Sequence, residues 1–135
     1  MIYAGIGYGE NEYYVNINGH ADYAPKGLDI VCAGVSALTS AFFDALAAAA
    51  VKEHCNRISL NTGDGHFSVY IDRINKKTID DMVRSFLLML NVGLYGIEGQ
   101  FPAQLKLKVF DLPERDNDND TSEQTMNSVR EEDKG

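Results

Sequence analysis

The fold of this chain is decided by residues 29–50, which read DIVCAGVSALTSAFFDALAAAA. Alanine and leucine are frequent in this stretch, and both have high intrinsic helix propensity. Apolar residues recur in it at the spacing of one helical face. These residues are Val31, Val35, Leu38, Phe42 and Leu46. We therefore predict a helix from Asp29 to about His54 with this stripe buried. Its remaining Ala, Gly and Ser surface permits close approach to a sheet or to a partner subunit.

Short stretches rich in aromatic and β-branched residues lie on both sides of this predicted helix, and each favours a strand. The expected strands are residues 2–8, 12–19, 56–62 and 67–71. Gly9-Glu10-Asn11 joins the first two, and Gly63-Asp64-Gly65 joins the second two. Both sequences are typical of tight turns. The chain is therefore expected to form one hairpin before the helix and one after it.

A second helix is expected to begin near Thr78, which forms a capping-box pattern with Asp81. Its glycines between Gly93 and Gly99 predict fraying at the end. Residues 104–110 alternate leucine and valine with lysine, which indicates a last half-buried strand. The element order ββαββαβ predicts an α+β fold, a two-layer sandwich of two helices packed on a mainly antiparallel sheet.

The charge of the chain is concentrated at one end. Its net charge is −8, and residues 111–135 carry −6 of this, from nine acids and three bases. We therefore predict a folded domain over residues 1–110 and an acidic, disordered tail over residues 111–135. The tail could recruit a basic partner, but a solvating role is the simpler interpretation. The nearly balanced domain argues against direct binding of duplex nucleic acid, which needs clustered Lys and Arg.

The start of the sequence and its cysteines indicate a cytoplasmic protein. Residues 1–9 contain no basic region, and acids follow at Glu10 and Glu12, so this stretch does not resemble an export signal. The longest apolar stretch, residues 41–51, contains Asp44 and is too short to span a bilayer. Two cysteines without an export signal are more naturally free thiols than a disulfide.

The reactive residues that the sequence suggests are Cys32 and His20. Cys32 falls in the first turn of the predicted helix, where unsatisfied N–H groups and the helix dipole favour negative charge on the thiol. The same N–H groups could donate to the oxyanion of a tetrahedral intermediate. His20 ends a predicted strand, and the loop of residues 21–28 would let it reach the thiol and take its proton. A packed cysteine and a surface histidine remain the structural alternative.

Four further residues near this pair have candidate roles. Gly19 precedes His20 and is a candidate supporting residue. Asp29 could orient His20 or hold the loop, and it could equally cap the helix. Ser36 lies one turn beyond Cys32, where it could donate a hydrogen bond or simply pack. His66, at the second hairpin, is the rival base, although a histidine at such a turn usually faces solvent.

We expect no metal or other cofactor. The three histidines and two cysteines are scattered, without the paired spacing of a metal site. His54 and Cys55 are interpreted as structural residues. The early glycines, Gly5 to Gly9, are not followed by a helix and so do not predict a phosphate-binding loop.

A resemblance to a known family points further. Gly19-His20-Ala21 followed by Gly27-Leu-Asp-Ile-Val-Cys32-Ala-Gly-Val-Ser36 resembles the signature of the ribosomal-processing cysteine protease family, Prp. The later Gly65-His66-Phe67 hairpin, the leucine-rich second helix and the last strand are also similar to that family. The resemblance covers residues 1 to about 110 and leaves the acidic tail outside.

The resemblance implies an activity and its partners. It implies a cysteine endopeptidase, usually a homodimer, in which Cys32 is the nucleophile and His20 the base. The implied substrate is the short N-terminal extension of a large-subunit ribosomal protein, apolar with aromatic residues before the cut. The loop of residues 21–28 would close over this peptide. No membrane partner is expected.

Two alternatives remain at this point. One is a non-catalytic, ribosome-associated module that binds the leader peptide without cutting it. The other is a phage or accessory copy of the enzyme that acts on a different protein with a similar leader. The acidic tail, which departs from the family pattern, keeps the second alternative open.

Overall fold

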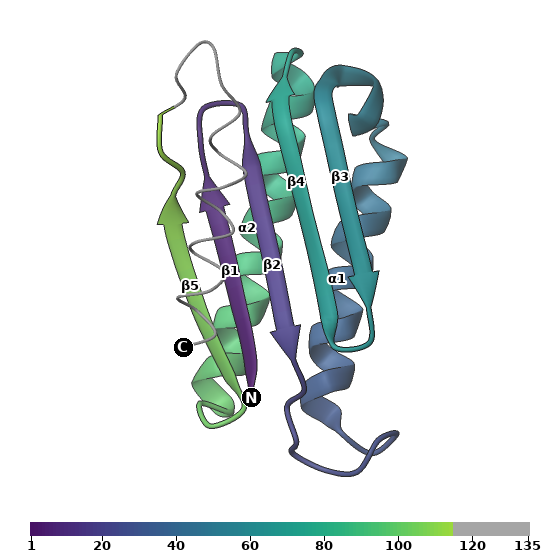
Figure 1. Cartoon of the computed structure of the whole chain (residues 1–135), viewed down its shortest axis with the longest axis vertical. Coiled ribbons are helices and arrows are strands. Elements are labelled where there is room, and N and C mark those ends of the chain that lie inside the picture. Colours follow the sequence, from purple (N-terminus) through teal and green to yellow (C-terminus); the bar gives the residue numbers. More distant parts are fainter. Residues whose placement is uncertain (115–135) are drawn as a thin grey trace.

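The structure is a computed structural model, and it describes residues 1–114. Two helices cover one face of a five-stranded sheet (Figure 1). The elements in chain order are β1 (Ile2–Tyr8), β2 (Tyr13–Gly19), α1 (Ile30–Ala48), η1 (Val51–His54), β3 (Cys55–Gly63), β4 (His66–Ile74), α2 (Lys77–Gln100) and β5 (Leu105–Asp111). The predicted α+β class and two-layer arrangement are confirmed. A short 3-10 helix, η1, is added to the predicted order.

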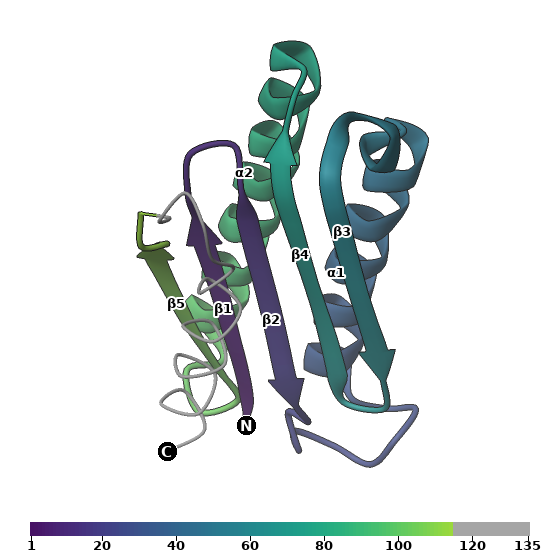
Figure 2. The same ribbon diagram turned by 45° about the horizontal axis from the view of Figure 1, so that its top comes forward.

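The sheet has the strand order β3-β4-β2-β1-β5. β5 pairs with β1 in parallel, and the other neighbouring strands pair antiparallel. Turning the molecule shows that α1 and α2 stay behind the same face, while no helix within residues 1–114 covers the opposite face (Figure 2). Both predicted hairpins are confirmed, because β1 pairs with β2 and β3 pairs with β4.

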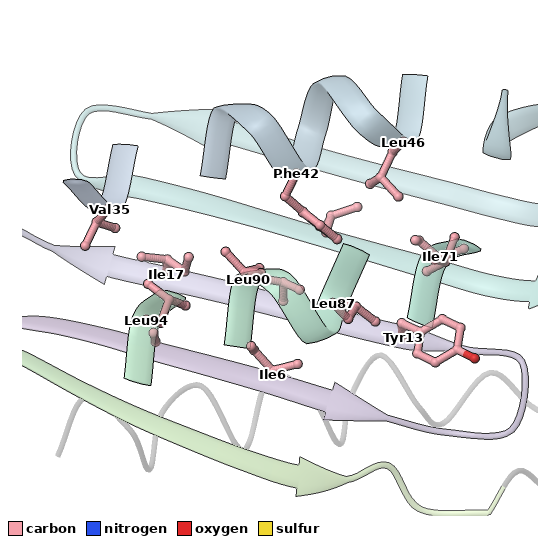
Figure 3. Close-up of a cluster of buried hydrophobic side chains, with 14 of the residues drawn as sticks. Ile6, Tyr13, Ile17, Val35, Phe42, Leu46, Ile71, Leu87, Leu90 and Leu94 are labelled. Atoms are coloured by element: carbon pink, nitrogen blue, oxygen red, sulfur yellow. The ribbon is translucent and has the colours of Figure 1, made fainter. Parts of the chain in front are cut away.

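The main core lies between the helices and the sheet. Alternate strand residues such as Ile6 and Ile17 point toward the helices and meet Phe42 of α1 and Leu90 of α2 (Figure 3). Leu87 and Leu94 are fully buried in the same layer. Removing a side chain of this size from water contributes about 1.5–3 kcal/mol. The core therefore fixes both helices against the strands that carry the site described below.

The first helix is shorter than predicted. α1 ends at Ala48, and Ala50 then adopts a left-handed backbone with φ of 54°. This turn brings Val51 into the core, where it is fully buried. The run of alanines at residues 47–50 has little to bury, so the burial of Val51 decides where the helix stops.

The second helix differs from prediction at both ends. It begins at Lys77, after Lys76, and no side chain caps it, so the predicted capping box at Thr78 is wrong. It continues to Gln100 without fraying at its glycines. A Cβ built on Gly93 would lie 2.8 Å from side-chain atoms of Leu38, so this glycine allows α1 and α2 to approach closely. Packing therefore outweighs the low helix propensity of glycine here.

α1 is the one helix in residues 1–114 long and apolar enough to cross a membrane, with a mean hydropathy of 1.7. The core helix of a water-soluble domain passes the same test. In this structure a stripe of its side chains, including Val31, Val35 and Phe42, is buried against the sheet. Of the apolar window, 28% is buried in this structure.

The last strand continues one residue past the expected domain boundary. β5 includes Asp111, and Leu112 is buried after it. The Leu112 N–H donates to the Tyr8 carbonyl oxygen at 2.7 Å. Residues 115–135, which hold most of the predicted acidic tail, lie outside the described part of the chain.

Candidate active site

Four segments meet at one end of the sheet. The end of β2, the loop of residues 20–29, the start of α1 and the turn between β3 and β4 all lie at the lower end of the molecule in Figure 1. Their side chains line a cavity of about 620 Å³. The lining includes every residue of the predicted site: Gly19, His20, Asp29, Cys32, Ser36 and His66. The fold therefore gathers the predicted candidates around one cavity.

The backbone of His20 is held on both sides. Gly19 has φ of +102°, a conformation that favours glycine, and its N–H donates to the Gly65 carbonyl oxygen at 2.8 Å. A Cβ at Gly19 would lie 2.2 Å from the Met1 carbonyl oxygen, so no side chain fits there. The Met1 amino group in turn donates to the His20 carbonyl oxygen at 2.6 Å. Gly19 therefore supports the site through its backbone.

The His20 ring lies over the turn between β3 and β4. A Cβ on Gly65 would be 2.5 Å from His20 Nε2, so the ring occupies the space that a side chain there would take. Asp64 Oδ1 lies 4.0 Å from the same nitrogen, but both side chains are largely exposed, so the pair is weak. The His20 ring therefore packs against the Gly65 backbone and stays accessible from the cavity.

Cys32 lies beside the residue that follows His20. The Ala21 N–H points at Cys32 Sγ, with nitrogen and sulfur 3.3 Å apart. Ala21 is buried, and Cys32 is half-buried at the edge of the core. An N–H donor stabilises negative charge on sulfur. This contact was not predictable from helix position, because it comes from the loop and not from the helix that carries the thiol.

Asp29 caps α1 and holds the loop before it. Its Oδ1 accepts from the N–H groups of Val31 and Cys32, both at 3.0 Å. Its Oδ2 accepts from the N–H groups of Tyr23 and Ala24, at 3.0 and 3.3 Å. The Cys32 N–H and these other donors lower the pKa of Asp29. Of the roles considered for Asp29, the structure supports capping and loop support, because its carboxylate bonds to the loop and to the helix start and not to His20.

This capping corrects one expectation about the helix start. The N–H groups of Val31 and Cys32 were expected to be available to an oxyanion, but Asp29 Oδ1 occupies both. The Ala33 N–H donates to the Asp29 carbonyl oxygen at 3.0 Å. The N–H groups of Val31, Cys32 and Ala33 thus all bond to Asp29, as is usual at the capped start of a helix. Ala21, outside the helix, supplies the N–H that faces the sulfur.

His66 and Cys55 have other roles in the structure. His66 Nδ1 pairs with Asn18 Oδ1, and its Nε2 lies 3.4 Å from Ser68 Oγ, so both ring nitrogens have polar partners on the sheet. Cys55 begins β3, at the end of that strand far from the cavity. Burial and, to a smaller extent, the nearby Asp72 charge raise the pKa of Cys55. Its thiol is therefore less ionised at neutral pH than an ordinary cysteine.

The described residues offer little for a metal ion. Within residues 1–114 no three His, Cys, Asp or Glu side chains are grouped so that they could hold one.

Ser36 lines the cavity one turn above Cys32, and its carbonyl oxygen accepts from Thr39 Oγ1 at 3.1 Å. The arrangement is that of an exposed imidazole and a half-buried thiol around one cavity.

Replacing Asp29 with asparagine is expected to separate its two roles. Asparagine still caps a helix, but its side-chain N–H₂ cannot accept from Tyr23 and Ala24, so the loop should loosen while α1 persists. Because the pKa of Asp29 is lowered on folding, wild-type stability from this carboxylate is full above its ordinary value of 3.8 and is lost as the pH falls below it. The variant should lack this acid-dependent loss.

Amide hydrogen exchange at Tyr23 and Ala24, together with thermal unfolding between pH 3 and 7, measures both effects. Asp22→Asn, at an exposed position of the same loop, is the matched control. Equal exchange in wild type and Asp29→Asn would contradict the assigned role.

The comparisons with known proteins identify the family of this chain. A family model described as cysteine protease Prp matches residues 1–106. The ribosomal processing protease Prp of S. aureus, solved with a covalently linked product peptide, is 28% identical, with a TM-score of 0.65. The alignment covers 81% of this chain and 99% of that one. The same S. aureus protein, solved with a substrate peptide, is 27% identical, with a TM-score of 0.58 and the same coverage.

SMU.848 from Streptococcus mutans is 25% identical, with a TM-score of 0.60, and the alignment covers 82% of this chain and 95% of that one. No curated protein matched the sequence. The family match spans the whole sheet-and-helix domain up to the start of β5 and includes both His20 and Cys32. This chain therefore belongs to the Prp family, and it is a cysteine protease.

Proposed function

We propose that this protease removes the short N-terminal extension of a large-subunit ribosomal protein in the cytoplasm, with Cys32 as nucleophile and His20 as base. The observation that carries the proposal is the contact between the Ala21 N–H and Cys32 Sγ, because it brings the residue next to His20 onto the thiol. Membership of a family named for ribosomal processing supports the substrate class. The S. aureus relative, solved with a substrate peptide, supports a peptide ligand.

The proposed reaction is acyl transfer in two steps. The Cys32 thiolate attacks the carbonyl carbon of the scissile bond, and the carbonyl oxygen becomes an oxyanion. His20, protonated by the thiol, gives its proton to the leaving amine as the C–N bond breaks, which leaves a thioester on Cys32. His20 then takes a proton from water, which attacks the thioester and releases the new carboxylate. In this scheme the Ala21 N–H, which faces the free thiolate, donates instead to the oxyanion once the sulfur is bonded to carbon.

The walls of the cavity suit an apolar peptide. Ile17 from β2, Val35 from α1 and Phe67 from β4 contribute to its lining. Apolar walls of this kind accept aliphatic and aromatic side chains, while a few polar groups orient the peptide. This composition agrees with a leader that carries aromatic residues before the cut.

Incubating the full chain with synthetic leader peptides and reading the products by mass spectrometry tests the proposal. A single cut after an aromatic residue is expected, with no cleavage of a peptide of the same composition in scrambled order. Binding of the leader without any cleavage would refute the peptidase role and favour the non-catalytic peptide-binding module instead.

We also propose that the enzyme is a homodimer whose two copies contact each other through the outer face of α2. The large apolar side chains on this face are 41% to 73% exposed: Met82, Leu88, Met89, Val92 and Tyr95. Arg84 is the one exposed charged residue between positions 82 and 99, and it donates a hydrogen bond to the Tyr13 hydroxyl. Such a face can meet its own copy without repulsion, which suits a two-fold contact.

The size of this face fits a second copy. Residues 82–99 form a face about 27 Å long, and two neighbouring helices are together about 20 Å wide. The projected area of both helices over this length is therefore on the order of 500 Å², and each partner of a standard stable interface buries about 800 Å² of accessible surface. α1 contributes small exposed residues beside it, including Ala37 and Ala41.

Introducing a charge at Met89 is expected to produce a monomer. Met89→Lys places one like charge from each copy in the proposed interface, and burying them without partners is unfavourable. Asn75→Lys, which adds the same charge at an exposed position outside α2, is the matched control and should remain dimeric. Sedimentation velocity measures both. Dimerisation of Met89→Lys at wild-type strength, or a monomeric wild type at high concentration, would contradict the proposed interface.

A further inference from the structure

The two ring nitrogens of His20 have different surroundings. The Nε2 end of the ring lies against the turn between β3 and β4. A Cβ on Gly65 would be 2.5 Å from Nε2, 2.9 Å from Cε1 and 3.1 Å from Cδ2, and Nδ1 is not among these nearest ring atoms. The ring therefore directs Nε2 toward the turn and keeps Nδ1 away from it.

The sulfur of Cys32 lies near the backbone end of His20. Its Sγ is 3.3 Å from the nitrogen of Ala21, which is joined directly to the carbonyl carbon of His20. Within an imidazole side chain, Nδ1 is bonded to Cγ and so lies near the backbone, whereas Nε2 lies on the far side of the ring. Nδ1 is therefore the ring nitrogen on the same side as the thiol.

A carboxylate stands beside the other nitrogen. Among residues 1–114, Asp64 is the one acid with an oxygen within 4.0 Å of a His20 ring nitrogen, and that nitrogen is Nε2. The nearby acids have other partners, because Asp29 accepts from four backbone N–H groups and Asp22 lies 3.8 Å from the Met1 amino group. A neutral imidazole carries one hydrogen, and a carboxylate beside Nε2 favours the form in which Nε2 carries it.

The pair between Asp64 and His20 is open in the free protein. A separation of 4.0 Å is longer than a hydrogen bond, and the Asp64 side chain is 86% exposed, so water screens the attraction. A peptide bound in the cavity would displace this water and strengthen the attraction. Hydrogen bonds between catalytic groups are often long in the free enzyme and tighten when substrate binds. Asp64 is thus placed to close on Nε2 at that point.

We infer that Nδ1 of His20 exchanges the proton with Cys32 and that Asp64 is the positioning residue that holds Nε2. Nδ1 accepts the thiol proton, which leaves a thiolate and an imidazolium, and then gives that proton to the leaving amine. Nε2 keeps its own hydrogen throughout and donates it to the Asp64 carboxylate, which stays ionised. The inference rests on the proposed function, because it specifies how the proposed base works.

Replacing His20 by Nδ1-methylhistidine in the full chain tests which nitrogen works. The methyl group blocks Nδ1 and leaves Nε2 basic, so cleavage of the leader peptide should fall by about 10²–10⁴-fold, to the level of His20→Ala. Thermal unfolding of the same sample checks that the domain remains folded. Cleavage near the wild-type rate would overturn the inference, because Nε2 would then be the base.

Asp64→Ala tests the positioning residue without altering the imidazole. It should lower kcat by about three- to tenfold, the contribution of one exposed hydrogen bond to a charged group. KM should change little, because Asp64 acts on the base. Asp64→Glu keeps a carboxylate that can reach the ring and should retain most of the activity. Asp44→Ala removes the same charge at an exposed position of α1 and is the matched control. A wild-type kcat in Asp64→Ala, or an equal loss in Asp64→Glu, would overturn the role of Asp64.

His20→Ala separates a failure of this inference from a failure of the proposed function. If His20→Ala cuts the peptide at the wild-type rate, His20 is not the base, and the proposed function and the inference fail together. If His20→Ala is impaired but the Nδ1-methylhistidine protein is not, His20 remains the base and the inference alone fails.

Discussion

Cys32→Ala is expected to abolish peptide cleavage while the protein stays folded. The proposed nucleophile is lost, and removing a catalytic nucleophile lowers kcat by a factor on the order of 10⁴ or more. Cys32 is half-buried at the edge of the core, so losing one sulfur atom should change the free energy of unfolding by only about 1 kcal/mol. The rate is measured on a leader peptide and the stability by thermal unfolding.

Cys32→Ser sharpens this prediction. A serine hydroxyl fills nearly the same space beside the Ala21 N–H but ionises far less readily than a thiol, so the variant should be almost as inactive. Cys55→Ala is the matched control, since it also removes a half-buried thiol but lies far from the cavity. If Cys32→Ser cut the peptide at a rate near that of wild type, Cys32 would not be the nucleophile.

His20→Ala is expected to lower cleavage by about 10²–10⁴-fold, the usual contribution of a general acid–base group. His66→Ala is the natural control, because His66 lines the same cavity but pairs with Asn18 and Ser68. It should keep most of the activity and lose some stability. Peptide cleavage by both variants, followed over pH 5 to 9, distinguishes the two histidines. A larger loss of activity in His66→Ala would transfer the role of base to His66.

Thiol labelling gives an independent measure of the same role. Iodoacetamide should label Cys32 faster than Cys55 near pH 7, because burial raises the pKa of Cys55 and keeps its thiol protonated. In His20→Ala this preference should shrink, since the proposed base for the Cys32 proton is gone. Equal labelling of both thiols in the wild type would speak against a reactive Cys32.

The sequence alone determined the layers of the fold. The stripe from Val31 to Leu46 and the alternation in the strands predicted two helices on a sheet, and both are confirmed. These signals are readable because helix and strand periods are local properties of neighbouring residues. The sequence also brought forward His20 and Cys32 as the pair to consider, through their motif and its family resemblance.

Only the tertiary structure decided which groups form hydrogen bonds with one another at the site. Asp29 takes the N–H groups of Val31 and Cys32, and the sulfur receives its donor from Ala21 across the loop. The Leu38 side chain fills the space where a side chain at position 93 would lie, so α2 contains a glycine there. Leu112 packs onto the face of the sheet opposite the helices. These contacts are set by how the elements pack in three dimensions. Local sequence repeats and helix or strand propensities do not predict them.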